Sequence, residues 1–287
     1  MAKSQNATFF ENCNKFVQHK FVRLVSGQGK CDKELLERHP LFLSQALLCA
    51  LLLLACAGCS LQKIATDKLG DALANGGTTF SSDDDPELIR NASPFSLKLM
   101  ESLLAKSPRH EGLLLAASRG FTQYSYCFVQ EDADEMEAQD LNGARALQAR
   151  ARRLYMRARG YGIRGLEVRH PGFEKGLREN PKAAVAKMEA GDVPLLYWTA
   201  ASWGSAISLS KDNPDLIADQ PIVEALIDRA FELDPDYDHG SIHAFLITYE
   251  AARKGVAGDA SARSKAHFER AMELTRGELA SPLVSYA

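Results

Sequence analysis

The sequence predicts an all-α fold of stacked helical hairpins, a degenerate tetratricopeptide-like α-solenoid. Apolar residues recur at helical spacing in one segment after another. After residue 60, no segment alternates apolar and polar residues as a strand does. RAFELDPDY at 229–237 and RAMELTRGE at 270–278 echo each other about 41 residues apart, and ESLLAKSPR at 101–109 is a weaker third copy. Tetratricopeptide hairpins repeat every ~34 residues, so one insertion accounts for the longer spacing.

An uncharged apolar run, 41–58, ends in small residues directly before Cys59. This order is typical of a bacterial lipoprotein signal, in which the cysteine becomes the lipidated first residue of the mature chain. Cys56 fits the same pattern. An uncleaved membrane-spanning helix is the alternative, because the run reaches the ~18 residues at which spanning becomes possible. We therefore expect a signal region at 1–58 and a helical domain at 59–287, held to a membrane by lipid on Cys59.

The residues before this run mix basic and acidic side chains, as in CDKELLER. The positive region of a signal is normally short, because the whole signal spans only ~15 to 30 residues. The sequence therefore predicts that translation starts near residue 35 and that residues 1–34 are not part of the natural protein.

The composition is that of an ordinary globular protein, with 46% hydrophobic and 25% charged residues. A net charge of -3 gives no electrostatic argument for binding nucleic acid. Processing would leave two cysteines, Cys59 and Cys127, and lipid would occupy the first. No intramolecular disulfide is therefore expected. Cys127 stands among aromatic residues, and we expect it to be a small buried hydrophobe.

Helical segments follow one another through the first half of the domain. Apolar spacing predicts a helix at 61–73. The triplet DDD before Pro86 predicts a helix start, because acidic side chains and an early proline favour that position. Calcium binding is the alternative, but calcium loops place their ligands at alternate positions. A helix is expected at 94–106, and a long helix, buried on most sides, at 110–130.

Eight arginines occupy the segment 145–169, after an acidic stretch at 131–140. One interpretation is a solvated helix whose arginines pair with nearby acids. Glycines at 160, 162 and 165 predict that the chain then breaks into short pieces.

The functional interpretation is that Arg157 or Arg164 faces the interior, because arginines at so many helix angles cannot all share one solvated face. Beside Tyr155 or Tyr161, such a guanidinium would orient an anionic group of a ligand. Acids of the chain would satisfy it otherwise. The acids considered are Asp132, Asp134 and Glu167.

The segment 193–210, VPLLYWTAASWGSAISLS, carries no charge and holds both tryptophans, so we expect the central buried helix here. Its Pro, Thr, Ser and Gly content argues against a membrane span. Its aromatic residues either belong to the core or line a ligand cavity. The candidate ligand-binding residues are Tyr124, Tyr155, Arg157, Tyr161, Arg164, Tyr197, Trp198 and Trp203.

Apolar stripes predict three further helices, around 222–233, 242–249 and 268–272. His239 and His243 stand at the i, i+4 spacing that can hold zinc, but no third ligand is evident.

Nucleotide loops, HExxH, GxSxG and CxxC motifs do not occur in 59–287. We therefore expect no catalytic residue, no metal and no cofactor.

Six blocks carry a family resemblance: DDDPELIR, PFSLKLMESLLAKSP, LLLAASRGFTQYSYCFVQ, RARRLYMRARGYG, VPLLYWTAASWGSAISLSKD and LDPDYDHGSIHAFL. They resemble the T-component of TRAP transporters, the tripartite ATP-independent periplasmic systems. The resemblance spans 59–287 and implies a periplasmic lipoprotein with tetratricopeptide-like helices. It further implies a homotrimer, a ligand-accommodating pore through each protomer, and docking to the substrate-binding P component.

Two features depart from that family. Gly160 stands where members carry an acidic residue, and members continue past SPLVSYA, so a C-terminal truncation is expected.

These observations predict a non-enzymatic lipoprotein that binds a small organic-acid or hydrophobic ligand for a TRAP system. The alternative is an envelope scaffold that makes protein contacts only. A cavity lined by Tyr155, Tyr197 and Trp203 would favour the first.

Overall fold

The structure is a computed structural model that describes residues 64–75, 80, 82–253 and 256–287. Within these residues the regular structure is helical, without a strand, so the all-α prediction is confirmed. All of them belong to one unit, Leu61–Ala287. The expected signal region and Cys59 lie outside the described residues.

The first long helix, α4 (Pro86–Leu104), begins where the aspartate triplet predicts. The carboxylate of Asp85 accepts hydrogen bonds from Glu87 N and Leu88 N, which otherwise lack partners in the first turn. The predicted helix start at Pro94 is wrong, because Pro94 lies inside α4. Proline removes one backbone hydrogen bond, and burial of Leu97 further along the helix helps to hold α4 together.

The predicted helix at 110–130 is present but changes its winding. It consists of α5 (Glu111–Ser125) and a π-helix, η1 (Tyr126–Gln130), and α6 (Glu131–Met136) continues it. A π turn is wider than an α turn, so it changes which side chains face the core. Cys127 is therefore exposed, contrary to the sequence-based expectation.

Helix α7 (Leu141–Arg169) runs unbroken through the three glycines, so the predicted break is wrong. Two of these glycines lie where other helices pass close by. A Cβ on Gly162 would collide with Thr199 Oγ1, and one on Gly165 would approach Leu195 Cδ2 to 2.6 Å. Here glycine permits close packing of α7 against a neighbouring helix.

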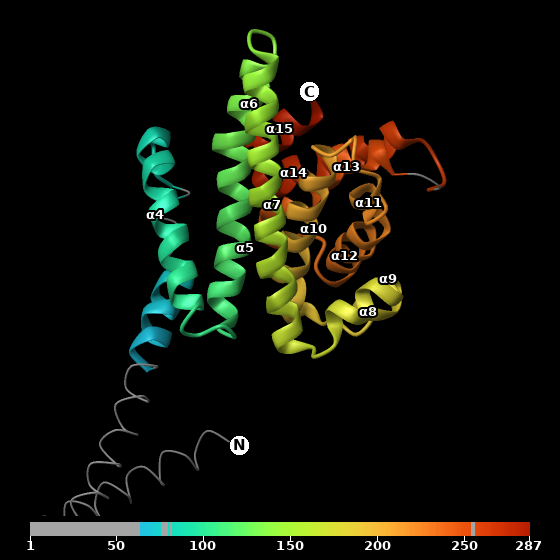
Figure 1. Ribbon diagram of the computed structural model, residues 1–287. Helices are drawn as coiled ribbons and strands as arrows, with labels where there is room; N and C mark the ends of the chain where they lie inside the picture. Colours follow the sequence, from blue (N-terminus) through green and yellow to red (C-terminus); the bar gives the residue numbers. More distant parts are fainter. Residues whose placement is uncertain (1–63, 76–79, 81, 254–255) are drawn as a thin grey trace, which may run out of the picture. The chain divides into compact units, whose positions relative to one another are not determined.

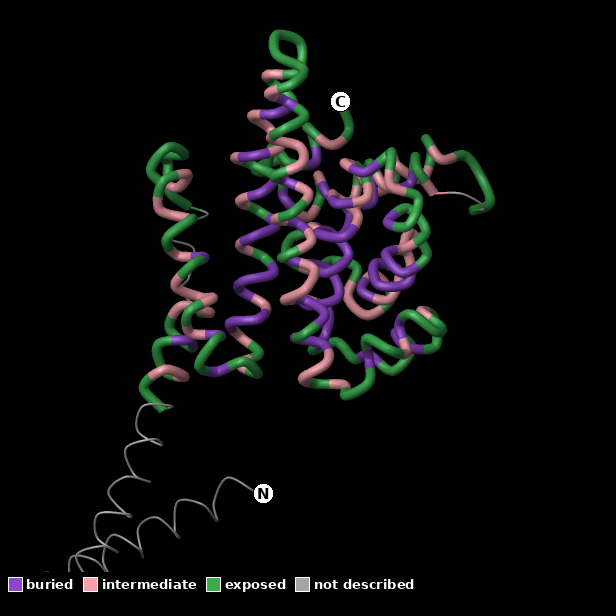
Figure 2. The backbone as a smooth tube through the Cα atoms, viewed as in Figure 1, coloured by how far each residue is buried: buried purple, intermediate pink, exposed green. Residues whose placement is uncertain are grey.

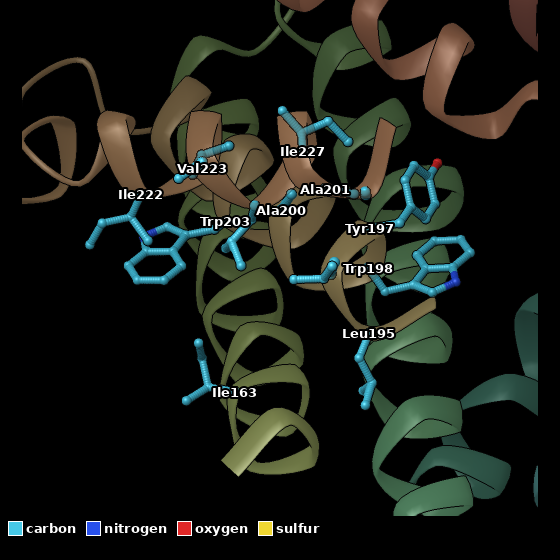
Figure 3. Packing of buried hydrophobic residues seen from close by; sticks show 14 of the residues in the cluster. Ile163, Leu195, Tyr197, Trp198, Ala200, Ala201, Trp203, Ile222, Val223 and Ile227 are labelled. Atoms are coloured by element: carbon cyan, nitrogen blue, oxygen red, sulfur yellow. The ribbon is translucent and has the colours of Figure 1, made fainter. Parts of the chain in front are cut away.

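The uncharged segment forms α10 (Val193–Ser208), the centre of the core. Helix α10 packs against α5, α7, α12 and α13. Figure 3 shows Trp203 beside Ile222 on one side of α10, and Tyr197 with Trp198 on the other. The predicted central helix is confirmed.

Shorter helices connect these elements and complete the C-terminal part. Long helices pack against the next long helix along the chain, with only short helices between them. The packed pairs are α4 with α5, α5 with α7, α7 with α10, α10 with α12, and α13 with α14 (Figure 1). Burial is concentrated on α5, α7, α10 and α12 (Figure 2). The other helices after α7 are α8 (Phe173–Glu179), α9 (Pro181–Val185), a 3-10 turn η2 (Ala190–Asp192), α11 (Pro214–Ile217), α12 (Gln220–Leu233), α13 (Tyr237–Ala252), α14 (Ala260–Thr275) and α15 (Ser281–Tyr286).

Candidate functional site

An open pocket of about 290 Å³ lies among α7, α8, α11 and the start of α12. We call it the Arg159 pocket. Asn213 positions one wall, because its side-chain oxygen accepts a hydrogen bond from Leu216 N and so caps α11. The lining residues are Met156, Arg159, Arg178, Asn213, Asp215, Leu216 and Asp219.

Arg159 lies between the core and this pocket. Its Cζ is 4.4 Å from the ring centroid of Trp203, a cation–π arrangement, and its side chain is 20% exposed. Arg159 Nε has no hydrogen-bond partner among the described residues. Arg159 Nη1 is 3.9 Å from Asp219 Oδ2, longer than a hydrogen-bonded ion pair. Burial lowers the pKa of Arg159; Asp219 opposes this shift and Arg178 adds to it.

Trp203 forms the apolar support beneath that guanidinium. Its side chain is only 2% exposed, and its indole Nε1 also lacks a partner within the described part of the chain. Arg159, which lines the pocket, therefore carries one unsatisfied donor group, and Trp203 beneath it carries another. A buried donor without an acceptor is costly, so this place favours a group that brings acceptor atoms.

The other two aromatic candidates on α10, Tyr197 and Trp198, form a second cluster away from Trp203. The rings of Tyr197 and Trp198 meet edge to face with centroids 4.9 Å apart, and Tyr237 packs on Tyr197 at 5.6 Å. Burial raises the pKa of Tyr197 above its ordinary value. The residues that line the Arg159 pocket include no member of this cluster.

Comparison with known proteins places the chain in a family. Residues 82–287, which include every helix from α4 to α15, match the family model described as TRAP transporter T-component. The chain belongs to the TRAP transporter T-component family. A protein of Treponema pallidum (strain Nichols), described as an uncharacterized protein, is 28% identical over 234 residues, covering 75% of this chain and 72% of that protein. The family name identifies a component of a transport system.

In this T-component, Arg157 and Arg164 do not face the interior, so that expectation is wrong. Arg157 Nε lies 3.3 Å from Glu101 Oε1, and Arg164 Nη2 donates to the carbonyl of Pro108 at 3.0 Å. Both guanidinium groups stay at the surface because a partner on another element reaches them there.

The partner of Arg157 is an acid that sequence reasoning missed. Glu101 on α4 also accepts a 2.6 Å hydrogen bond from Tyr161, whose ring stacks on Phe121. Burial disfavours the charged form of Glu101, but Lys98, Tyr161 and Arg157 hold its pKa below the ordinary value. Burial and Glu101 together raise the pKa of Tyr161 to about 12. This internally satisfied cluster joins α4 to α7.

The acids expected as inward partners have other roles. Asp132 holds Arg90 through two hydrogen bonds of 2.6 and 3.0 Å. Glu167 accepts hydrogen bonds from Gly172 N and Glu174 N, which fixes the turn after α7.

Tyr155 and Tyr124 lie near the π-helix of the T-component rather than at the Arg159 pocket. Tyr155 is fully buried and donates a 2.8 Å hydrogen bond to Gln130 Oε1, and burial raises its pKa. Tyr124 accepts a 3.3 Å hydrogen bond from Arg150. These contacts link α7 to α5 and η1.

The histidine pair singled out in the sequence does not form. His243 instead meets His267 of α14, with 2.9 Å between their Nδ1 atoms. His239 lies in a left-handed turn with φ 56. Among the described residues, no cluster of three or more metal-ligand side chains is present.

Sequence reasoning chose the right helix for an inward arginine but the wrong residues. Arg159 follows Tyr155 by four positions and precedes Ile163 by four, so it lies on the stripe that α7 turns to the core. This spacing could have identified Arg159 as an inward-facing residue from the sequence. Arg178, Asp215 and Asp219 could not be found this way, because the fold alone brings them to α7.

Proposed function

We propose that this T-component is a membrane-anchored envelope protein that binds a small organic solute in the Arg159 pocket and docks the substrate-binding P component of a TRAP system. Membership of the T-component family over α4 to α15 carries the proposal. The Arg159 pocket supports the binding role, because its lining is mostly polar and includes Arg159, whose buried Nε has no hydrogen-bond partner among the described residues.

The proposed anchor is lipid on Cys59. The uncharged run before that cysteine supports this proposal. In the described residues, no helix is both long and apolar enough to cross a membrane. Assembly as a homotrimer is proposed on the family resemblance.

Co-isolation from membranes tests the proposed function. The tagged full chain is purified in mild detergent from cells that express their TRAP system, and a tagged, unrelated envelope lipoprotein serves as the control. We expect enrichment of the P component with the chain and not with the control. Failure to enrich any TRAP component, even after chemical cross-linking in intact cells, would contradict the transport assignment.

The same preparation tests the solute-binding role. Mass spectrometry of small molecules released on denaturation is expected to find a compound retained by the wild-type chain. Arg159→Gln is expected to lose it, whereas Arg164→Gln, which changes an exposed arginine of the same helix, is expected to retain it. Equal retention by both variants would remove the Arg159 pocket from the proposal.

A further inference from the structure

The charges around the Arg159 pocket are balanced but only partly paired. Its lining holds two arginines and two aspartates, so the formal charges cancel. The closest approach between them that forms an ion pair is the 3.9 Å between Arg159 and Asp219. Arg178 and Asp215 form no ion pair with any described residue. Arg178 and Asp215 therefore have no ion-pair partner among the described residues, and Arg159 and Asp219 are joined only by this long pair.

Exposed ion pairs in this chain range from loose ones, such as Arg152 with Asp212 at 4.0 Å, to close ones. Arg270 and Asp236 are about as exposed as surface groups usually are, yet Arg270 Nη2 approaches Asp236 Oδ2 to 2.6 Å. Arg253 and Asp228 reach 2.6 Å as well. Charge-assisted hydrogen bonds normally have lengths of ~2.7 to 2.9 Å. At the Arg159 pocket, by contrast, the fold holds opposite charges beyond that distance.

One part of the pocket offers donors. Arg159 keeps an unpartnered, buried Nε, and stacking on Trp203 fixes the plane of its guanidinium. Arg178 adds a second cation. Asn213 uses its side-chain oxygen to cap α11, which leaves its amide group as a further donor. A planar guanidinium with neighbouring donors suits a carboxylate.

The same lining also offers acceptors, and Asp219 Oδ2 lies 3.9 Å from Arg159 Nη1. Asp219 precedes α12, but its side chain makes no capping hydrogen bond there. Asp215 lies exposed in the first turn of α11. Ionised carboxylates accept hydrogen bonds and donate none, so both suit a cationic donor such as an ammonium group.

Size and the remaining lining limit the ligand further. Met156 and Leu216 supply apolar surface, which suits a short hydrocarbon segment between two charged ends. The open pocket of about 290 Å³ has room for a small metabolite. A dicarboxylate would place its second negative charge near Asp215 and Asp219, which would repel it. A diamine would place its second positive charge near Arg159 and Arg178, which would repel that charge.

We infer that the Arg159 pocket binds a small zwitterion, an amino acid in the broad sense, with its carboxylate at Arg159 and Arg178 and its ammonium group at Asp215 and Asp219. This inference rests on the proposed solute-binding function and names the class of solute.

Calorimetric titration of the full chain in detergent tests the inference. The probes are the ω-amino acids from glycine to 6-aminohexanoate, each compared with the acid and the amine of the same chain length. We expect at least one amino acid to bind ten times or more tightly than its matched acid and amine. Equal binding of the acid would show an anion site, and no binding across the whole series would likewise overturn the inference.

Paired variants locate the two ends of the ligand. Arg178→Gln is expected to weaken binding of the amino acid about tenfold, and it leaves the core intact because Arg178 is exposed. Asp215→Asn is expected to weaken the amino acid similarly but not the matched acid. Asp212→Asn is the control, since Asp212 lies just before α11, has an 89% exposed side chain and does not line the pocket.

If Asp215→Asn and Asp212→Asn behave alike, the ammonium site is wrong. This test can fail or succeed independently of the test of the transport assignment. Selective binding of a zwitterion without co-isolation of a TRAP component would support the inference and contradict the proposed function. Co-isolation without zwitterion binding would do the reverse.

Discussion

Trp203 is the residue that connects the core to the proposed site. It is 2% exposed, Arg159 covers its ring, and Ile222 lies beside it (Figure 3). We expect Trp203→Ala to lower the free energy of unfolding by about 3 to 5 kcal/mol, because truncation of a buried aromatic side chain loses burial and leaves a cavity. Urea denaturation followed by circular dichroism measures this loss.

Phe95→Ala is the matched control, because Phe95 is 73% exposed. Its free energy of unfolding should change by less than about 0.5 kcal/mol, as for most surface substitutions. Similar losses in both variants would mean that Trp203 is not the enclosed residue that the structure describes.

Helix α7 owes its close packing to particular glycines rather than to all of them. A methyl group at Gly162 would meet Thr199 Oγ1 and Ser118 Oγ, whereas one at Gly160 would meet nothing within 4 Å. Gly162→Ala should therefore destabilise the fold by about 1 to 3 kcal/mol through overpacking. Gly160→Ala should stabilise it by about 0.5 to 1 kcal/mol, since alanine favours a helix interior. Thermal and urea unfolding of the two variants check this opposite pair of signs, and a neutral Gly162→Ala would contradict the described crossing.

The junction of α12, α13 and α14 contains a buried histidine pair with a predictable pH dependence. Burial and the nearby His267 lower the pKa of His243 to about 4, although Asp236 opposes the shift. Burial also lowers the pKa of His267. Unfolded histidine titrates near ~6.5, so between the two values the unfolded chain binds more protons than the folded one. Stability should fall as the pH drops from about 6.5 to 4.

His243→Gln isolates this contribution, because carboxylates titrate in the lower part of the same range. Urea midpoints of wild type and variant, measured from pH 7.5 to 4, should converge as the pH falls, since only the wild type loses the contribution of His243. Arg270 and Asp236 face the pair and remain in both proteins. Parallel curves would show that the pair does not titrate abnormally.

Across the whole molecule, the helices with strong apolar spacing could be predicted from the sequence. The uncharged segment 193–210 gave α10, and the triplet before Pro86 gave the start of α4. Glycines in α7 were misread as breaks because local propensity favours a break, and only the neighbouring helix explains why they are needed. The pocket could not be predicted from the sequence for a similar reason, because its charged residues come from four elements that only the fold brings together.

At this scale, the proposed anchor has a direct test. Cys59→Ala should move the chain from the membrane fraction to the soluble fraction, because acyl chains supply about 0.8 kcal/mol for each buried CH₂ group. Fractionation followed by immunoblotting measures the distribution, with Cys127→Ala as the control. Membrane retention of Cys59→Ala after signal cleavage would point to Cys56 or to another attachment.

The central claim is that this T-component binds a small solute at Arg159, and the two tryptophans of the chain allow one direct measurement. Each indole N–H gives its own signal in a nitrogen–proton correlation spectrum, and Trp203→Phe assigns them. Small molecules extracted from the natively purified chain are returned to the ligand-free protein. We predict that the Trp203 signal shifts in proportion to occupancy, because Arg159 lies on that ring, while the Trp198 signal stays in place. A shift of Trp198 alone, or of neither signal while the solute binds, would contradict the account.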